Sequence, residues 1–348
     1  MDGGREPAAV PGRNRRLQPQ RIYRHQRNID PMTAATDVSR AEAWVMAARP
    51  QTLPAGAAPV LMGVALAVAG GVFTPLPAAA ALVGALLIQI GTNFANDYFD
   101  AVKGADTADS EGFTRVTAGG LIPPRRVRLA TAVTYGLALL VGCYLVYVGG
   151  VPILVLGLAS IVAGVLYTGG PYPYGYYGLG DLFVFVFFGL AAVTGTYYVQ
   201  AVAAKAVGAL PVSLPAGTVP TDVLVASLAA AGLSTAILVV NNVRDIETDA
   251  EAGKETLAVM LGYTWSRVEF LVMLALAYAV PVALWAGFEY SPGVLLPLVT
   301  LPLAALVART VWTQTAGDPL NAALERTGQL LALYALLFAA GLVVPQVT

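Results

Sequence analysis

The chain has 348 residues, a formal net charge of −1, 57% hydrophobic residues and only 12% charged residues. Soluble domains carry about 25% charged residues, so this composition excludes a soluble enzyme and an intrinsically disordered chain. The balanced charge also argues against a nucleic-acid partner. The single cysteine, Cys143, and the single histidine, His25, exclude a disulfide framework, a zinc site and a Ser–His catalytic pair.

The first 42 residues differ from the rest of the chain. They are rich in arginine, and residues 1–31 contain no apolar run long enough for a secretory signal. We therefore expect residues 1–42 to form a disordered cytoplasmic tail, of which residues 1–31 are dispensable. An alternative is that translation starts at Met32, which precedes a short polar lead into Trp44.

The remaining residues, 43–348, are dominated by long apolar segments. Residues 50–96 and 129–180 contain no charged side chain at all, and a helix needs about 20 apolar residues to span a bilayer. Proline, glycine and charged residues predict where each span ends. We therefore expect an all-α, polytopic membrane bundle of about nine transmembrane helices. The predicted spans are 53–71, 77–97, 127–147, 151–168, 181–203, 221–243, 264–287, 292–313 and 327–345.

Lysine and arginine are distributed unevenly between the two sides of such a bundle. With nine spans, the N-terminus and the loops after the second, fourth, sixth and eighth spans share one side, and Lys205 is the only cation on the other. Because cytoplasmic loops are enriched in Lys and Arg, we expect a multi-pass plasma-membrane protein with its N-terminus and both charged loops in the cytoplasm. The cations that support this orientation are Arg40, Arg49, Lys103, Arg115, Arg125, Arg126, Arg128, Arg244, Lys254, Arg267, Arg309 and Arg326.

A first cluster of polar residues occurs where the second span ends. Asn96 and Asp100 are four residues apart, so they share one face of the helix. Asn93 and Asp97 form a neighbouring pair with the same spacing. Because acids at the ends of apolar helices are costly, they indicate a functional site rather than ordinary loop charges.

A second cluster follows the sixth span and lies on the same side of the membrane. Asp245 and Asp249 are again four residues apart, and Asn242 precedes Asp245 by three residues. Clustered carboxylates repel one another and require a cation. Mg²⁺ is usually held by one or two carboxylates together with substrate phosphates. We therefore expect the two clusters to face each other and to hold a diphosphate through Mg²⁺, in a cradle completed by basic side chains. Those basic candidates are Lys103, Arg115, Arg244 and Lys254.

These two clusters resemble the motifs of the UbiA superfamily of intramembrane prenyltransferases. Members of that superfamily have nine helices, with Asp-rich motifs after helices 2 and 6. Its N-D-x-x-D motif is matched by Asn96, Asp97 and Asp100. Its D-x-x-x-D motif is matched by Asp245 and Asp249.

One departure from the common superfamily pattern points to a particular branch. The further acid of the first motif normally follows the second Asp by four residues, but here that position is Gly104 and the next acid is Asp106. This spacing, with Lys103 before the glycine, is similar to the 1,4-dihydroxy-2-naphthoate prenyltransferase branch. The resemblance covers about residues 44–346. Other segments that share it are 48–54, 167–171, 195–200, 253–259 and 320–327.

The resemblance implies Mg²⁺-dependent transfer of a polyprenyl group from polyprenyl diphosphate to 1,4-dihydroxy-2-naphthoate. Diphosphate and CO₂ are released, and the product is demethylmenaquinol, in menaquinone biosynthesis. The implied partners are these two substrates and the lipid bilayer, with no nucleic acid and no obligatory protein partner. The implied catalytic and metal-binding residues are Asp97, Asp100, Asp245 and Asp249, with Asp106 as a further metal ligand. The implied substrate-binding residues are Asn93, Asn96, Lys103, Arg115, Asn242, Arg244, Lys254, Arg49, Tyr197 and Tyr198.

The positions of several tyrosines and of two cations indicate further parts of this implied site. Aromatic faces can stabilise a developing carbocation, and Tyr197 and Tyr198 lie within the fifth span, so both are pocket candidates. Lys103 and Arg49 are the candidates for binding the carboxylate of the acceptor. The tyrosines of the preceding Gly/Pro loop better fit an interfacial aromatic belt. These are Tyr172, Tyr174, Tyr176 and Tyr177.

Two alternatives remain open at this point. The same superfamily includes enzymes that use other acceptors, such as 4-hydroxybenzoate or homogentisate. A cation-coupled membrane transporter could also use acids as ion ligands, although transporters usually place such sites near the bilayer midplane. Both acidic clusters here end their spans on one side, which favours a diphosphate site over a transport site.

Overall fold

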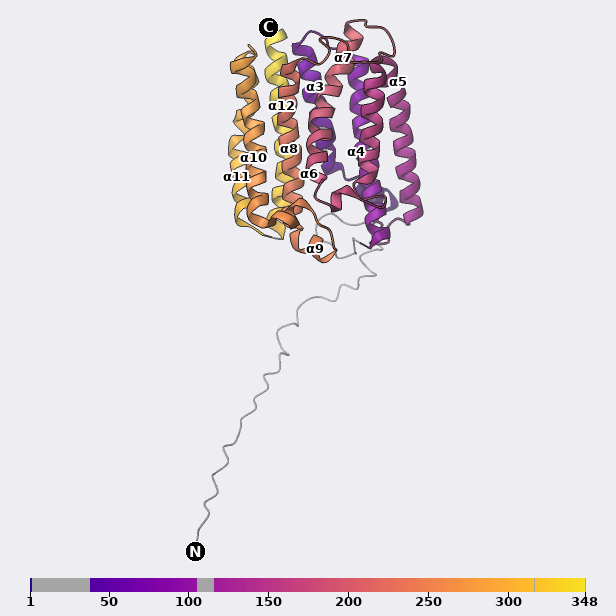
Figure 1. The fold of residues 1–348 in the computed structure, drawn as a ribbon, viewed down its shortest axis with the longest axis vertical. Coiled ribbons are helices and arrows are strands. Elements are labelled where there is room, and N and C mark those ends of the chain that lie inside the picture. Colours follow the sequence, from indigo (N-terminus) through magenta and orange to yellow (C-terminus); the bar gives the residue numbers. More distant parts are fainter. Residues whose placement is uncertain (2–37, 105–115, 316, 348) are drawn as a thin grey trace. The chain divides into compact units, whose positions relative to one another are not determined.

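The computed structural model describes residue 1 and residues 38–104, 116–315 and 317–347. Within those residues every regular element is helical, and the helices from Ser39 onward form one bundle (Figure 1). The elements are α2 (Arg40–Ala48), η1 (Pro50–Thr52), α3 (Leu53–Ala69), α4 (Pro75–Lys103), α5 (Pro124–Leu166), η2 (Tyr174–Tyr176), α6 (Gly180–Val184), η3 (Phe185–Ala191), α7 (Ala192–Ala204), α8 (Thr221–Arg244), α9 (Ile246–Glu251), α10 (Leu257–Gly287), η4 (Pro292–Thr300), α11 (Leu301–Thr313) and α12 (Asp318–Val347).

Eight helical segments of the described residues are long and apolar enough to cross a membrane. Some consist of consecutive elements, such as α6, η3 and α7, which together form the continuous segment Gly180–Ala204. The predicted all-α, polytopic membrane bundle is confirmed. The chain is therefore an integral membrane protein.

The difference between eight segments and nine predicted spans lies in α5. Its 43 residues would extend about 65 Å as one straight helix, roughly twice the hydrocarbon thickness of a bilayer. Gly150 interrupts it with φ 66° and ψ −150°, a conformation open essentially to glycine alone. The chain folds back there, because Gly164 lies against the hydroxyl of Tyr135 from the first half. The described residues of α5 thus hold the two predicted spans, 127–147 and 151–168.

The helix boundaries follow local signals in the sequence. Ser39 and Glu42 form a capping box at the start of α2, so the helix begins at Arg40, two residues before the predicted end of the tail at residue 42. The rest of that predicted tail, residues 2–37 with Met32, lies outside the described residues. Helix α4 continues past the predicted end at residue 97 and ends at Lys103. The next residue, Gly104, caps the helix with a left-handed backbone conformation (φ 71°).

Two later helices begin before the predicted starts. Helix α10 begins at Leu257 rather than at 264, but non-helical Gly262 divides it (φ 70°, ψ 174°). The main part of α10 thus begins after Gly262, close to the predicted start at residue 264. Helix α12 begins at Asp318, nine residues before the predicted 327, because residues 320–327 contain neither proline nor glycine.

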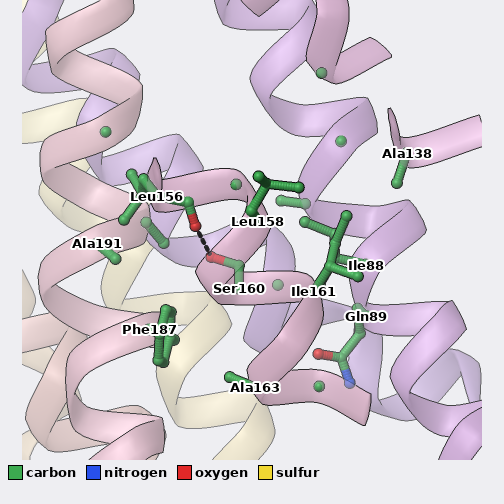
Figure 2. Close-up of a pocket in the computed structure, with 18 of the residues that line it drawn as sticks. Ile88, Gln89, Ala138, Leu156, Leu158, Ser160, Ile161, Ala163, Phe187 and Ala191 are labelled. Atoms are coloured by element: carbon green, nitrogen blue, oxygen red, sulfur yellow. Dashed lines mark hydrogen bonds between the residues drawn. The ribbon is translucent and has the colours of Figure 1, made fainter. Parts of the chain in front are cut away.

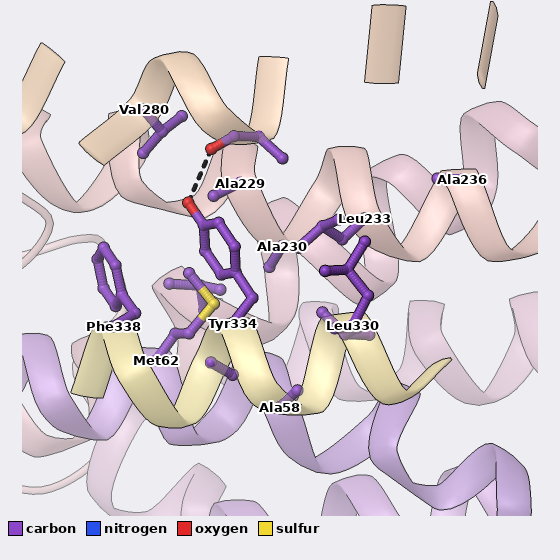
Figure 3. Packing of buried hydrophobic residues seen from close by; sticks show 14 of the residues in the cluster. Ala58, Met62, Ala229, Ala230, Leu233, Ala236, Val280, Leu330, Tyr334 and Phe338 are labelled. Carbon is purple, nitrogen blue, oxygen red and sulfur yellow. Dashed lines mark hydrogen bonds between the residues drawn. The ribbon is translucent and has the colours of Figure 1, made fainter. Parts of the chain in front are cut away.

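The core lies where α3, α8, α10 and α12 meet. Helix α8 buries a series of small side chains, including Ala229, Ala230 and Ala236, which allow close approach of neighbouring helices. Tyr334 of α12 is fully buried, and its hydroxyl donates to the carbonyl of Ala277 in α10 at 2.7 Å (Figure 3). This bond satisfies the one polar atom that the tyrosine carries into the apolar core.

Candidate active site

The first acidic motif lies in the last turns of α4. Asp97 and Asp100 are buried, with exposures of 2% and 7%. One carboxylate oxygen of Asp97 accepts from the backbone N–H of Thr117 at 3.1 Å and from the Thr117 hydroxyl. One carboxylate oxygen of Asp100 accepts from the hydroxyl of Tyr176 at 2.5 Å. Both acids are therefore oriented by groups from other parts of the chain.

The two asparagines of the same helix contact different segments. The Asn93 side chain donates to the carbonyl of Ala48 and to the hydroxyl of Thr52, both at 2.9 Å. The Asn96 side-chain oxygen accepts from the hydroxyl of Thr168 at 3.0 Å. These bonds connect α4 to the α2–α3 junction on one side and to the end of α5 on the other.

The second motif begins where α8 ends. Arg244 is buried and donates to both carboxylate oxygens of Asp245, at 2.7 Å each, a bidentate geometry with strong orientational preference. The same guanidinium donates to the side-chain oxygens of Asn241 at 3.0 Å and of Asn321, in α12, at 3.1 Å. Asn242 is also buried at this end of α8. Arg244 therefore binds the motif acid in this structure rather than lying free as a phosphate ligand.

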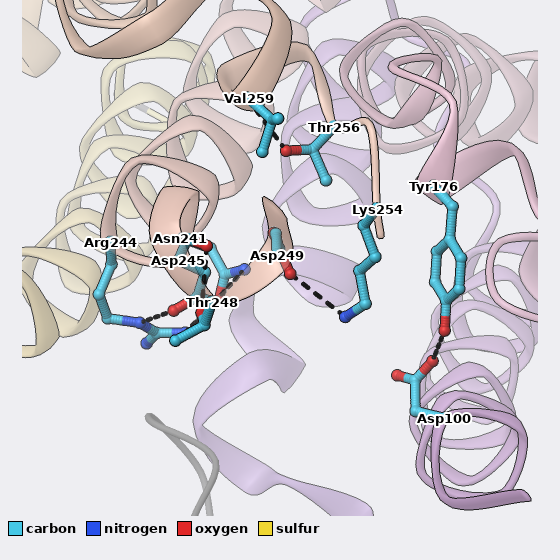
Figure 4. Close-up of polar contacts among 10 residues, drawn as sticks. All are labelled: Asp100, Tyr176, Asn241, Arg244, Asp245, Thr248, Asp249, Lys254, Thr256 and Val259. Atoms are coloured by element: carbon cyan, nitrogen blue, oxygen red, sulfur yellow. Dashed lines mark hydrogen bonds and ion pairs between the residues drawn. The ribbon is translucent and has the colours of Figure 1, made fainter. Parts of the chain in front are cut away.

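Asp249 forms the other half of the second motif, on the short helix α9. Its carboxylate lies 3.3 Å from the Lys254 ammonium (Figure 4). Burial raises the pKa of the Asp249 carboxyl; Lys254 lowers it, and the negative charges of Asp245 and Asp100 raise it. The electrostatic influence of Asp100 indicates that the two motifs are near each other.

Tyr176 lies above Asp100 and faces Lys254 of the second motif (Figure 4). Its hydroxyl donates to Asp100, and its ring centroid is 5.4 Å from the Lys103 ammonium and 5.1 Å from the Lys254 ammonium. Its carbonyl accepts from the backbone N–H of Glu255 at 2.8 Å. The predicted convergence of the two clusters is thus seen, and a tyrosine from a third segment connects them.

A cavity of about 570 Å³ lies between α3, α4, α5 and the η3–α7 segment. At one end its lining includes Asn93, Asn96 and Tyr167; at the other it includes Tyr147 and Leu210. Between these ends the walls are largely apolar, as Figure 2 shows with side chains from α4, α5 and η3. The cavity therefore leads from the first acidic motif into the apolar interior of the bundle.

Lys103 and Arg49, the predicted acceptor cations, have distinct environments. The Lys103 ammonium donates to the carbonyls of Thr168 at 2.6 Å and Gly170 at 3.1 Å, which fixes it to the loop after α5. Arg49 follows the last residue of α2 and has a left-handed backbone conformation (φ 50°, ψ 67°). It lies beside the α2–α3 junction that Asn93 contacts. Two further predicted residues, Arg115 and Asp106, lie outside the described residues.

The structure does not bring Tyr197 and Tyr198 to the acidic motifs. The Tyr198 hydroxyl donates to the carbonyl of Gly149 at 2.8 Å, beside the turn of α5. The Tyr197 hydroxyl lies against Gly70, at the end of α3 remote from Asn93. Although both tyrosines lie in the predicted span, they face the opposite end of the bundle.

The donor set at the acidic end is compatible with Mg²⁺. The four aspartates provide hard oxygen ligands on α4, at the end of α8 and on α9, and Arg244 and Lys254 pair with the two acids of the second motif. Among the described residues, no three His, Cys, Asp or Glu side chains could hold one ion together. Paired carboxylates suit an ion that also takes ligands from phosphate oxygens and water.

Asn241, which donates to Asp245 at 3.3 Å from the preceding turn of α8, was not among the predicted site residues. Four residues more distant in sequence that contact the motif side chains were also missed. They come from loops or from the last helix, so no spacing in the sequence connects them to the acids. Tyr176 carried a visible signal, since it lies in a tyrosine-rich loop, but that loop was interpreted as an interfacial aromatic belt. The four residues are Thr117, Thr168, Tyr176 and Asn321.

The profile of the UbiA prenyltransferase family matches residues 57–337. The chain belongs to this family. The resemblance predicted from the two Asp-rich motifs is thereby confirmed, and the match covers α3 to α12 with the cavity and both acidic motifs.

Similar curated proteins carry the name of the predicted branch. The 1,4-dihydroxy-2-naphthoate octaprenyltransferase of Escherichia coli (strain K12) is 39% identical over 316 residues, covering 89% of this chain and 97% of that protein. The protein of the same name from Mycobacterium tuberculosis (strain ATCC 25618 / H37Rv) is 37% identical, covering 88% and 98%. UbiA prenyltransferase domain-containing protein 1 of Rattus norvegicus is 32% identical, covering 86% and 83%.

Solved structures of UbiA homologues share the fold. The apo structure of a UbiA homologue from Aeropyrum pernix K1 aligns with a TM-score of 0.63 at 16% identity, covering 84% of this chain and 98% of that one. A UbiA homologue from Archaeoglobus fulgidus bound to DMAPP and Mg²⁺ aligns with a TM-score of 0.56 at 14% identity, covering 86% and 99%. At these identities the alignments establish the shared helical architecture.

Proposed function

We propose that this protein transfers a polyprenyl group from a polyprenyl diphosphate to 1,4-dihydroxy-2-naphthoate, releasing diphosphate and CO₂ and forming demethylmenaquinol. The observation that carries the proposal is the convergence of two acidic motifs, the first of which contributes Asn96 to the lining of a largely apolar cavity. Full-length similarity to relatives named as 1,4-dihydroxy-2-naphthoate octaprenyltransferases supports this choice of acceptor.

The polar groups at the acidic end bind the diphosphate and its metal ion. Mg²⁺, when bound, supplies positive charge that offsets the charge developing on the departing diphosphate. Asp97, Asp100, Asp245 and Asp249 would hold it. Lys254 lies beside Asp249 and adds cationic charge where the leaving group forms. Arg244 acts through its bidentate contact, which keeps Asp245 in one orientation.

The cavity holds the hydrocarbon chain and the reacting carbon of the prenyl donor. Its apolar walls accommodate a prenyl tail and exclude water from an allylic cation. Asn93 and Asn96 line the cavity at its polar end, so this is where the diphosphate and the first isoprene unit would meet the acceptor ring. Holding both reactants there makes the transfer effectively intramolecular.

The chemistry of the acceptor removes the need for a strong protein base. Attack by the ring carbon that bears the carboxylate gives an intermediate that regains aromaticity by losing CO₂. This fits a chain whose only histidine is His25, in the N-terminal segment. We propose Lys103 and Arg49 as the cations near the acceptor carboxylate.

We further propose that the protein lies in the plasma membrane with the acidic motifs facing the cytoplasm. The distribution of lysine and arginine between the two sides supports this orientation. A polyprenyl diphosphate would then present its head group to the motifs from the cytoplasmic side while its tail remains among the helices and lipids.

An acceptor panel tests the proposal. The purified protein in detergent would be given Mg²⁺, one long polyprenyl diphosphate and, separately, 1,4-dihydroxy-2-naphthoate, 4-hydroxybenzoate or homogentisate. We expect prenylation of the dihydroxynaphthoate with one CO₂ released per product. Faster conversion of 4-hydroxybenzoate with its carboxylate retained would assign a different acceptor, and no product in detergent with any acceptor would favour a transporter.

A further inference from the structure

Tyr176 occupies a fixed position between the two acidic motifs. It ends the short η2 turn, where its backbone N–H donates to the carbonyl of Pro173 at 2.8 Å. Its carbonyl accepts from the backbone N–H of Glu255, also at 2.8 Å. The ring is thus held by its own loop and by the segment that follows the second motif.

The side chain contacts charged groups of both motifs. Its hydroxyl donates to the Asp100 carboxylate at 2.5 Å. Its ring centroid lies 5.1 Å from the Lys254 ammonium, which is itself 3.3 Å from Asp249, and 5.4 Å from the Lys103 ammonium. Figure 4 shows Tyr176 directly above Asp100, with Lys254 between this pair and Asp249. One rigid side chain therefore spans the distance between an acid of the first motif and the ion pair of the second.

Two physical effects follow from these contacts. A hydrogen bond to a metal-binding carboxylate fixes the orientation of its oxygens, and loss of such an outer bond commonly weakens metal binding about 10-fold or more. An aromatic face within about 6 Å of an ammonium attracts it and restricts where it rests. A tyrosine can provide both effects at once because its polar and aromatic parts point in a fixed relation.

We propose that Tyr176 is a positioning residue that couples the two motifs, a role that rests on the proposed function. Its hydroxyl orients Asp100 for the divalent cation, and its ring holds the Lys254 ammonium beside Asp249, where the diphosphate lies. Separate changes to the hydroxyl and to the ring should therefore affect metal binding and diphosphate binding differently.

Two variants separate the hydroxyl from the ring. Tyr176→Phe removes the bond to Asp100 and keeps the ring beneath the lysines, whereas Tyr176→Leu removes both. Tyr177→Phe is the matched control, because Tyr177 is the next residue in the loop and its side chain is 48% exposed. Melting curves in metal-free detergent buffer check that each variant is folded.

The primary measurement is binding of Mn²⁺, as a probe for Mg²⁺, followed by electron paramagnetic resonance with inorganic pyrophosphate present. We expect Tyr176→Phe to weaken Mn²⁺ binding about 10-fold and Tyr177→Phe to leave it unchanged. Tyr176→Leu should in addition raise the KM for geranyl diphosphate about threefold relative to Tyr176→Phe, because the ammonium loses its aromatic contact. Mn²⁺ affinity of Tyr176→Phe within twofold of the unmodified protein would overturn the proposal.

A double-variant cycle tests whether Tyr176 acts through Asp100. In an Asp100→Asn background, Tyr176→Phe should weaken Mn²⁺ binding no further, and an equal further loss would refute the coupling. The measurement also distinguishes this inference from the proposed reaction. If no acceptor is prenylated but Tyr176→Phe still weakens Mn²⁺ binding, the proposed prenyl transfer is wrong and the role of Tyr176 in the metal site stands.

Discussion

Each of the four motif acids has a partner of a different chemical kind. One accepts from a threonine, one from a tyrosine, one from a guanidinium and one from an ammonium. Hydroxyl partners leave the negative charge of a carboxylate in place, whereas cations offset it. The two motifs thus differ in the partners of their acids, which are hydroxyls in the first motif and cations in the second. The pairs are Asp97 with Thr117, Asp100 with Tyr176, Asp245 with Arg244 and Asp249 with Lys254.

Replacement of any one motif acid by asparagine should lower turnover by at least about 100-fold, because an oriented negative charge is lost at the diphosphate site. For Asp97, Asp100 and Asp249 we expect unchanged helix content by circular dichroism. Asp245→Asn should also lower thermal stability, by about 1–3 kcal/mol, because the buried Arg244 loses a charged acceptor.

The matched control for this series is Glu251→Gln. Glu251 lies on α9, two residues after Asp249, but its side chain is exposed. It should retain full activity, while EDTA should abolish the activity of the unmodified protein. Metal-independent turnover, or a fully active Asp245→Asn, would contradict the assignment of these acids.

At the scale of single residues, the sequence predicted which charged side chains form the site but not which residues contact them. The acids were predictable because they occur at the ends of apolar runs, where an ionised side chain is costly and usually has a function. Tyr176 was not, because its partners are distant in sequence and depend on how the loops fold. Tyr197 was placed in the correct span, but which end of the bundle it faces depends on helix direction and packing.

Gly150 is the residue on which the hairpin within α5 depends. A Cβ at this position would overlap the carbonyl of Pro211, and the φ of 66° is itself unfavourable for other residues. Gly150→Ala should therefore destabilise the protein by about 1–3 kcal/mol from backbone strain alone. Thermal melting in detergent measures this loss.

Gly136→Ala is the control for that change. Gly136 lies in the first half of α5, and a Cβ there would meet nothing within 4 Å. Alanine is favoured over glycine inside a helix by about 0.5–1 kcal/mol, so this variant should melt at the same or a higher temperature. Equal melting temperatures for the two variants would show that the turn is not restricted to glycine.

The η3–α7 segment offers a test of the cavity. Ala191 lines it (Figure 2) and lies about 15 Å along the segment from Gly180. Ala191→Phe should fill the deeper part of the cavity and lower kcat/KM for octaprenyl diphosphate about 10-fold more than for geranyl diphosphate, because the longer chain reaches further. Ala305→Phe, on an exposed position of α11, should affect both donors equally. If the ratio of kcat/KM for octaprenyl diphosphate to that for geranyl diphosphate is the same in both variants, the prenyl tail does not lie in this part of the cavity.

Helix positions were largely predictable because apolar length and helix-breaking residues determine them. The span 221–243 differs from α8 (Thr221–Arg244) by one residue. The extension of α4 to Lys103 was not predicted, because polar residues after 97 look like the end of a membrane span although they continue the helix. Hydropathy identifies the part of a helix within the bilayer, whereas backbone geometry decides where the helix itself ends.

For the molecule as a whole, the prediction that residues 1–31 are dispensable remains to be tested. They contain no apolar periodicity with which to bury a face. A protein that begins at Met32 should reach the membrane in normal amounts and catalyse at the normal rate. Turnover per mole of membrane-inserted protein is the measurement, and a loss at equal abundance would show that the segment contributes.

The bond between Arg244 and Asn321 bears on how the protein is made. Synthesis proceeds from the N-terminus, so the bidentate pair of Arg244 and Asp245 emerges well before α12. Until α12 inserts, the guanidinium lacks the Asn321 oxygen that accepts from it at 3.1 Å. The second motif is therefore completed only when the last helix joins the bundle. A nascent chain that stops before α12 would contain both acidic motifs but lack this acceptor for the buried Arg244.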